Sequence, residues 1–330
     1  MINFRYHVVS LTAVFLSLAV GLVLGSTVLN GPMLDALNNQ VSTLGQANQQ
    51  LREQVSFLEE EAKREETFAT EAAPLLLDGA LAGRRVALVV LPEAGDYVDG
   101  LVDTLELAGA DVTGTVRFTD RFVQPAQRLN QLLDLAHNAL PPSVDADELP
   151  ANSDGVETSA ALLAAVLLHR VGGDGDLAVE PSGPEEDAEP TGVPAEDRQA
   201  VLSAYAAADY LELDQRVTAP AEIVLVVSAL PFTDADATEK NQALLTTVEQ
   251  FSQAGPVVVA GAGPSGDGNL VAEIRGDLEL SESISTVDNV STPQGQVATG
   301  LVVVDELAGE TGHYGDGSGA EALLPDRSTP

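Results

Sequence analysis

The chain has 330 residues, with 51 Asp and Glu residues against 15 Lys and Arg and a formal net charge of -36. A surface this negative repels phosphate backbones and anionic headgroups, so we expect no nucleic-acid partner. The sequence contains no cysteine and only two methionines, which excludes disulfides, thiolate metal sites, cysteine nucleophiles and a thioether cage for Cu(I).

The acidity has two interpretations. It concentrates cations near the protein, or it is a general adaptation to high salt. Lysine occurs only at Lys63 and Lys240, and acidic residues are spread along the whole chain beyond its N-terminal region. This even spread favours the adaptation over a dedicated cation site.

A long apolar segment follows the first few residues. Residues 6–34 contain no Asp, Glu, Lys or Arg, and residues 8–29 are almost wholly apolar. At about 1.5 Å per residue, a helix over residues 8–29 spans about 33 Å, close to the roughly 30 Å hydrocarbon core of a bilayer. We therefore predict a single-pass transmembrane helix in contact with membrane lipid. A cleaved signal peptide is the alternative, although its apolar region usually runs only about 7–15 residues.

The charges on either side of this helix predict its orientation. Arg5 and the amino terminus precede it, whereas Asp35 is the first charged residue after it and acidic residues dominate beyond. Positively charged flanks of a membrane helix tend to stay in the cytoplasm. We expect residues 1–7 to be cytoplasmic and the rest of the chain, beyond the cell membrane, to be extracytoplasmic.

One face of the predicted membrane helix carries small residues. They recur at every fourth position, as Ala13, Ser17, Gly21 and Gly25. Such a stripe lets two helix backbones approach closely in lipid, although small residues are common in membrane helices in general. The stripe is a candidate surface for helix packing.

Residues 33–66 show the heptad spacing of a coiled coil. Apolar residues alternate three and four apart at the core positions, as Leu34, Leu37, Val41, Leu44, Leu51, Val55, Leu58 and Ala62. Valine at a positions with leucine at d positions favours two parallel strands, and a buried asparagine such as Asn48 at the central a position commonly fixes register and dimeric state. We therefore predict a parallel homodimer. The alternative is a helix that packs within its own chain.

Beyond residue 74 the pattern changes to alternating strands and helices. Apolar runs predict buried strands at residues 85–91, 111–118, 222–227 and 256–260. Helical spacing predicts helices at residues 96–108, 125–140, 158–170, 197–211 and 236–254. Residues 296–304 fit a last strand, with a helix as the alternative. This alternation predicts the α/β class, with a doubly wound, mostly parallel sheet.

We assign the α/β domain to residues 83–310. Residues 172–197 interrupt it with a segment rich in Gly, Pro, Asp and Glu, which cannot bury enough apolar surface to order itself. We predict that this segment is a disordered, flexible acidic insertion, whose carboxylates lack the fixed geometry of a cation site. Residues 311–330 form a Gly-rich, acidic tail.

A glycine-rich loop is the first candidate for chemistry. Residues 261–266 match G-x-G-x-x-G after a strand, the pattern that brings a backbone close to a dinucleotide pyrophosphate. Pro264 lies inside the loop and no clear helix start follows, so a glycine-rich turn is the favoured interpretation. The sequence shows no Ser/His/Asp order, H-x-x-x-H pair or P-loop. We expect no catalytic residues, no organic cofactor and no enzymatic activity.

A histidine and a carboxylate near the C-terminus are the second candidate. His313 and Asp316 lie together within residues 312–317. Imidazole suits Cu(II) and Zn(II), but one histidine and one aspartate do not complete a metal site. They are weak candidates for metal ligands, and the remaining ligands of such a site would come from elsewhere or from a partner chain. A structural role is the alternative.

Several segments from both ends of the chain share one family resemblance. They are residues 5–16 (RYHVVSLTAVFL), 21–25, the coiled coil, 83–90, Phe122-Val123, 284–289 (ISTVDN) and 312–315 (GHYG). Together they resemble the mycobacterial copper transport protein B (MctB) family of actinobacteria, over nearly the whole chain apart from the acidic insertion. The resemblance implies a role in copper homeostasis, described for the family as copper efflux through the outer membrane. It supplies no ligand set that can be transferred to this chain.

These observations predict a membrane-anchored cell-envelope protein that assists copper efflux by binding the ion or by contacting a channel or another envelope protein. An outer-membrane location is the family-based alternative. With one apolar helix and buried α/β strands, we do not expect the chain to form a pore itself. The main functional alternative is a structural envelope scaffold, dimerised by the coiled coil and without a metal role. A nucleotide binder is a third hypothesis, which depends on residues 261–266 alone.

Overall fold

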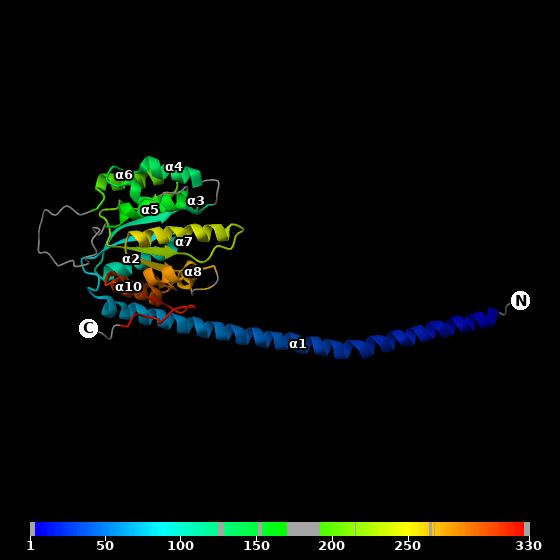
Figure 1. Ribbon diagram of the computed structural model, residues 1–330. Coiled ribbons are helices and arrows are strands. Elements are labelled where there is room, and N and C mark those ends of the chain that lie inside the picture. Colours follow the sequence, from blue (N-terminus) through cyan, green and yellow to red (C-terminus); the bar gives the residue numbers. More distant parts are fainter. Residues whose placement is uncertain are drawn as a thin grey trace. The chain divides into compact units, whose positions relative to one another are not determined.

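The computed structural model describes residues 4–124, 129–150, 154–169, 192–214, 216–263, 266 and 268–326. The chain divides into two compact units, Met1–Arg64 and Glu65–Pro330. Helix α1 (Phe4–Leu77) makes up the described part of the first unit and begins the second (Figure 1). The two helices predicted at residues 8–29 and 33–66 are therefore parts of one continuous helix.

The first part of α1 has the character of a membrane span. Phe4–Gly25 is long and apolar enough to cross a bilayer, and none of its most apolar stretch is buried against the described chain. This span begins four residues before the predicted one. The side chains of residues 26–29, at the end of the predicted span, lie outside the described part of the chain.

The second unit is built on one sheet. Its seven described strands are β1 (Arg85–Val90), β2 (Asp111–Phe118), β3 (Leu211–Leu213), β4 (Ile223–Ser228), β5 (Val257–Gly261), β6 (Ser285–Val287) and β7 (His313–Tyr314). They lie in the order β3-β2-β1-β4-β5-β6-β7, and every neighbouring pair is parallel except β2 with β3. The four strands predicted from apolar runs are β1, β2, β4 and β5, and the predicted doubly wound, mostly parallel fold is confirmed.

Helices cover both faces of this sheet. They are α2 (Val98–Leu107), α3 (Asp120–Val123), α4 (Leu129–Ala139), α5 (Gly155–Leu167), α6 (Ala195–Ala207), α7 (Ala237–Ala254), α8 (Leu270–Gly276), α9 (Leu278–Ser283) and α10 (Pro293–Leu307). Two 3-10 turns, η1 (Gly95–Tyr97) and η2 (Ala146–Glu148), complete the described elements. Helices α4 to α7 lie on one face, and α2 and α10 lie on the other (Figure 1).

Strand β1 shows how one apolar run supplies two cores. Ala87 and Val89 belong to the core under α4 to α8, whereas Val86 and Leu88 belong to the core with α2, α10 and the end of α1. Successive side chains of a strand point to opposite faces, so a strand that is buried on both faces needs apolar residues at every position. This is why continuous apolar runs predicted the central strands correctly.

Residues 296–304 form a helix and not the last strand that we favoured. They lie in α10, where Thr292 caps the N-terminus by accepting from the Gly295 backbone N–H, and Pro293 occupies the first turn. Both features are typical of a helix start. Because α10 is buried on most sides, its apolar residues show no helical period, and the sequence pattern fits a buried strand equally well.

The C-terminal segment belongs to the sheet. His313 and Tyr314 form β7, so this part of residues 311–330, assigned above to a tail, is a component of the domain. The predicted insertion is also shorter than expected at its C-terminal end. Val193 is buried and α6 begins at Ala195, whereas residues 172–191 lie outside the described part of the chain.

Candidate functional site

Two of the segments that carry the family resemblance come together at one end of the sheet. Strand β6 pairs with β7, with Thr286 opposite His313 and Val287 opposite Tyr314. The backbone N–H of Asp288 donates to the carbonyl of Tyr314 at 3.1 Å. The residues 284–289 and 312–315, which are separated in the chain by helix α10, therefore form a single edge of the fold.

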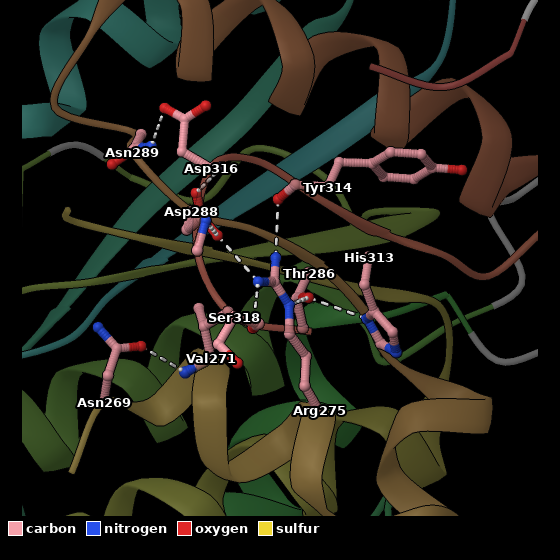
Figure 2. Close-up of polar contacts among 11 residues, drawn as sticks. Asn269, Val271, Arg275, Thr286, Asp288, Asn289, His313, Tyr314, Asp316 and Ser318 are labelled. Atoms are coloured by element: carbon pink, nitrogen blue, oxygen red, sulfur yellow. Dashed lines mark hydrogen bonds and ion pairs between the residues drawn. The ribbon is translucent and has the colours of Figure 1, made fainter. Parts of the chain in front are cut away.

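A buried ion pair lies across this edge. Arg275, from α8, donates through Nη1 to Asp288 Oδ2 at 2.8 Å, and the two side chains are only 3% and 0% exposed (Figure 2). Arg275 also donates to the carbonyl of Tyr314 at 2.7 Å and to that of Ser318 at 3.2 Å. Buried charges are tolerated when they are paired and their remaining hydrogen-bonding positions are filled. The arginine meets both requirements.

The carboxylate of Asp288 is satisfied from the C-terminal segment. It accepts from the backbone N–H of Asp316 at 2.7 Å and from that of Gly317 at 3.0 Å. Between them and β7, Gly315 has a φ of 128°, and a Cβ there would lie 2.0 Å from Asp288 Oδ1. Only glycine fits this position, because a side chain would occupy the place of the carboxylate. The pair Arg275–Asp288 thus clamps residues 314–318 onto the sheet.

His313 is part of the same network. Its Nδ1 lies 2.9 Å from the hydroxyl of Thr286, which also accepts from Arg275 Nε at 2.8 Å. Burial, followed by the positive charge of Arg275, lowers the pKa of His313 below its ordinary value, while Glu321 and a backbone hydrogen bond with Ser281 oppose the shift. The imidazole is therefore neutral at neutral pH.

Asp316, the other predicted metal ligand, points elsewhere. Its Oδ2 accepts from Asn289 Nδ2 at 2.6 Å, and Figure 2 shows its carboxylate directed away from the ring of His313. Among the described residues, no group of three or more His, Cys, Asp or Glu is placed to hold a metal ion. The structure therefore places both candidates in one network of hydrogen bonds but does not bring them together as a ligand set.

A second buried carboxyl group lies beside the first network. Ser285 Oγ donates to Glu306 Oε2 at 2.6 Å and accepts from the backbone N–H of Gly312 at 3.0 Å. Burial raises the pKa of Glu306, against smaller opposing effects of hydrogen bonds from Ser285 and Thr311. The side chain of Glu306 joins α10 to β6 and to the start of β7.

The described part of the glycine-rich loop is used for packing. A Cβ at Gly261 would lie 2.7 Å from Val271 Cγ2, and Gly263 has a φ of 71°. The carbonyls of Gly261 and Gly263 accept from the backbone N–H groups of Val290 and Asn289. These contacts explain both glycines without a ligand. Residues 264–265 of the predicted dinucleotide pattern lie outside the described part of the chain.

The first unit contributes surfaces and not a cluster of side chains. A Cβ at Gly21 or Gly25 would meet nothing within 4 Å, so this face of α1 is open. Ser17 donates to the carbonyl of Val14 at 2.9 Å, which satisfies the hydroxyl within the helix, and Ala13 and Asn48 are exposed. The predicted packing residues therefore lie on α1 with no described part of the chain against them.

Arg275 is the central residue that the sequence analysis did not single out. It is one of only 15 basic residues, and it lies in a short helix beside buried Leu270, Val271 and Ile274. A scarce basic residue within an apolar pattern is a signal for a buried partner of opposite charge. The identity of that partner depends on the pairing of distant segments.

An apolar N-terminal helix of membrane-spanning length and a doubly wound α/β unit define a membrane protein with a folded domain. Residues 1–325 match the family described as "Copper transport outer membrane protein, MctB", so the chain belongs to this family and the predicted membership is confirmed.

Curated relatives support the same assignment over the full length. The protein named Copper transporter MctB from Mycobacterium tuberculosis (strain ATCC 25618 / H37Rv) is 30% identical over 335 residues, which cover 98% of this chain and 99% of the relative. The protein of the same name from Mycobacterium leprae (strain TN) is 30% identical over 332 residues, with the same coverage.

Proposed function

We propose that this chain is a membrane-anchored cell-envelope protein that assists copper efflux without catalysing a reaction. The observation that supports the proposal is the similarity to copper transporters from end to end, which includes the apolar helix Phe4–Gly25. Its α/β unit would act outside the cytoplasmic membrane, because Arg5 precedes the helix and acidic residues follow it.

Contact with a partner is the manner of action that the described residues favour. His313 bonds through Nδ1 to Thr286, and Asp316 accepts from Asn289, so both side chains already have structural partners. Among the described residues there is no cluster of three metal-binding side chains. We therefore propose that the protein supports a channel or another envelope protein, and that copper is the cargo of that assembly.

Cellular copper in a deletion strain tests the copper role. We expect deletion to raise the copper content of the cells and to lower their copper tolerance, and we expect the wild-type gene to restore both. Unchanged content and tolerance would reject the role.

A His313→Gln variant then separates binding from partner contact. If the protein acts by contact, the variant restores tolerance as well as the wild type does, and neither purified protein retains copper after exposure and gel filtration. Copper that remains bound to the wild type and is lost from the variant would instead support direct binding. An Asn289→Ala variant, which removes the contact of Asp316, is the matched control.

Reporter fusions test the proposed orientation. A reporter that is active only outside the cytoplasm, fused after Pro330, is expected to be active, and the same reporter fused before Met1 is expected to be silent. The reverse pattern would place the α/β unit in the cytoplasm and exclude the proposed function as stated.

The exposed apolar residues of α1 favour one other candidate, a structural envelope scaffold without a metal role. These residues form a long surface for contact with a protein. In this case deletion would leave copper content unchanged but would remove crosslinked products between this chain and other envelope proteins.

A further inference from the structure

A row of large apolar side chains on α1 lacks any cover from the described chain. Six residues at heptad core positions are between 50% and 66% exposed: Leu37, Val41, Leu44, Leu51, Val55 and Leu58. Side chains of this size in a continuous row are unfavourable in water and mark a contact surface. The row lies in the segment with charged residues beyond the apolar span, so lipid does not cover it.

The shape of this surface indicates what covers it. The outward b, c and f positions carry polar residues apart from Ala36 and Phe57, so the apolar stripe is confined to the a and d positions. A helix that packs on a globular domain needs a wider stripe, whereas a narrow a/d stripe is the contact surface of a coiled coil.

Where α1 does pack within its own chain, the pattern is different. Ala69, Ala73 and Leu77 recur at intervals of four and are 8%, 7% and 0% exposed. Two alanines at successive turns let the helix approach its own domain closely. The intrachain contact of the second unit therefore uses small residues at a different spacing from the leucine and valine row of the first unit.

We propose that residues 37–62 of α1 form a parallel, in-register, two-stranded coiled coil with a second copy of this chain. In this register Asn48 faces the Asn48 of the other copy, where the two side-chain amides can hydrogen-bond each other. In an antiparallel pair, a positions face d positions, so this asparagine would lie against leucine without a partner. The parallel direction also allows the two Phe4–Gly25 helices to enter the same bilayer.

Acidic residues mark the position at which the proposed coiled coil ends. Glu65 occupies the next d position after Leu58, and Glu61 at g would face Glu66 at e of the other copy. Like charges across a coiled coil, together with a carboxylate in its core, oppose further pairing. The pairing therefore ends before Ala69, which is buried within its own unit.

Single cysteines test this arrangement directly, because the natural sequence contains none. Val41→Cys and Val55→Cys place a thiol at two a positions, and Gln46→Cys and Glu53→Cys place one at two outward f positions. Two differently tagged copies of the full-length chain would be expressed together in the native host, and isolated membranes would be mildly oxidised. We expect at least about tenfold more disulfide-linked dimer at positions 41 and 55 than at positions 46 and 53.

Each outcome of this experiment decides the proposal. Strong linkage at both a positions, with both tags in the product, supports the parallel homodimer. Little linkage at either a position is expected of an antiparallel pair, because its a positions face d positions, and this result would overturn the parallel arrangement. Equal linkage at a and f positions indicates random collision. A disulfide adduct with another protein, or monomer alone at every position, would overturn the proposal. None of these outcomes depends on the copper role.

Discussion

The two units of the chain place the same residue type in opposite surroundings. Val41 and Val55 on α1 are 66% and 52% exposed, whereas Val86, Val226 and Val259 in the sheet are 0% exposed. The difference lies in the neighbours along the sequence. A strand residue belongs to a continuous apolar run that the same chain covers on both faces, but a heptad residue stands between polar positions. The first pattern is completed within one molecule, whereas the proposed coiled coil would complete the second pattern with a second copy of the chain.

The largest expected effect concerns the ion pair that completes the second unit. Asp288→Asn removes the negative charge opposite Arg275 while keeping the volume of the side chain. Leaving one buried charge unpaired typically costs about 3–5 kcal/mol of the free energy of unfolding. Urea unfolding of the purified full-length protein in detergent measures the loss.

An exposed residue of the same segment supplies the control for this change. Asp316→Asn is expected to alter the free energy of unfolding by less than about 1 kcal/mol. Equal losses for the two variants would show that the buried pair does not stabilise the unit in the way its geometry indicates.

A glycine in the second unit tests how tightly this unit is packed. A Cβ at Gly295 would lie 2.0 Å from the carbonyl oxygen of Asn289, which is backbone and cannot simply rotate away. We expect Gly295→Ala to lower the free energy of unfolding by about 1–3 kcal/mol, as overpacking does. Gly276→Ala, which would meet nothing within 4 Å, is the control. A neutral Gly295→Ala variant would contradict the close approach of α10 to this loop.

A charged residue in the apolar row of α1 tests the proposed pairing of the first unit. Leu51→Glu places a carboxylate at a core position of the proposed coil, where burial without a partner is unfavourable. In a chain that also carries Val41→Cys, we expect the disulfide-linked dimer to fall by at least about tenfold, which corresponds to about 1.4 kcal/mol. The unfolding of the α/β unit should remain unchanged, and Gln50→Glu, on the outward face, should leave both properties unchanged. If Leu51→Glu also destabilised the α/β unit against unfolding, the stability of the two units would depend on each other.

The smallest expected effect is a pH dependence in the second unit. The pKa of His313 is lowered in the folded chain, so the unfolded chain binds more protons as the solution becomes acidic. The contribution of His313 to the free energy of unfolding is present above the ordinary histidine pKa, about 6.5. It is lost as the pH falls through the lowered pKa of the folded chain. Unfolding measured from pH 7 to pH 5 should show this loss in the wild type and less of it in His313→Gln. The exposed His137→Gln variant should behave as the wild type does.

Much of the second unit was predictable because a strand buried on both faces appears in the sequence as a continuous apolar run. Strands β1, β2, β4 and β5 were identified from their apolar runs. Strands β3, β6 and β7 were missed because they contain two or three residues each. Strand β6 reads Ser-Thr-Val, and hydrogen bonds, not apolar side chains, satisfy its buried hydroxyls. The hydrophobic periodicity of the sequence does not indicate such a strand.

The candidate site was predictable only in part. The proximity of His313 and Asp316 in sequence suggested a shared role, and both do belong to one network. The partners that determine this role are Arg275 and Asp288, from segments that are distant in the sequence. A single sequence does not reveal which distant segments pair. The local pair His313 and Asp316 therefore suggested a metal site, whereas the contacts of Arg275 and Asp288 show that this segment is held onto the sheet by a buried ion pair.

The buried pair Arg275–Asp288 depends on residues near the C-terminal end of the second unit, and this affects the order in which the two units can fold during synthesis. Asp288 receives two of its hydrogen bonds from Asp316 and Gly317, so the surroundings of this charged pair cannot be completed until residues 316 and 317 have left the ribosome. Until then β6 is an open edge of the sheet. The turns of α1, in contrast, need only neighbouring residues and form as they emerge. In a nascent chain the apolar helix Phe4–Gly25 is therefore available before the α/β unit can be completed.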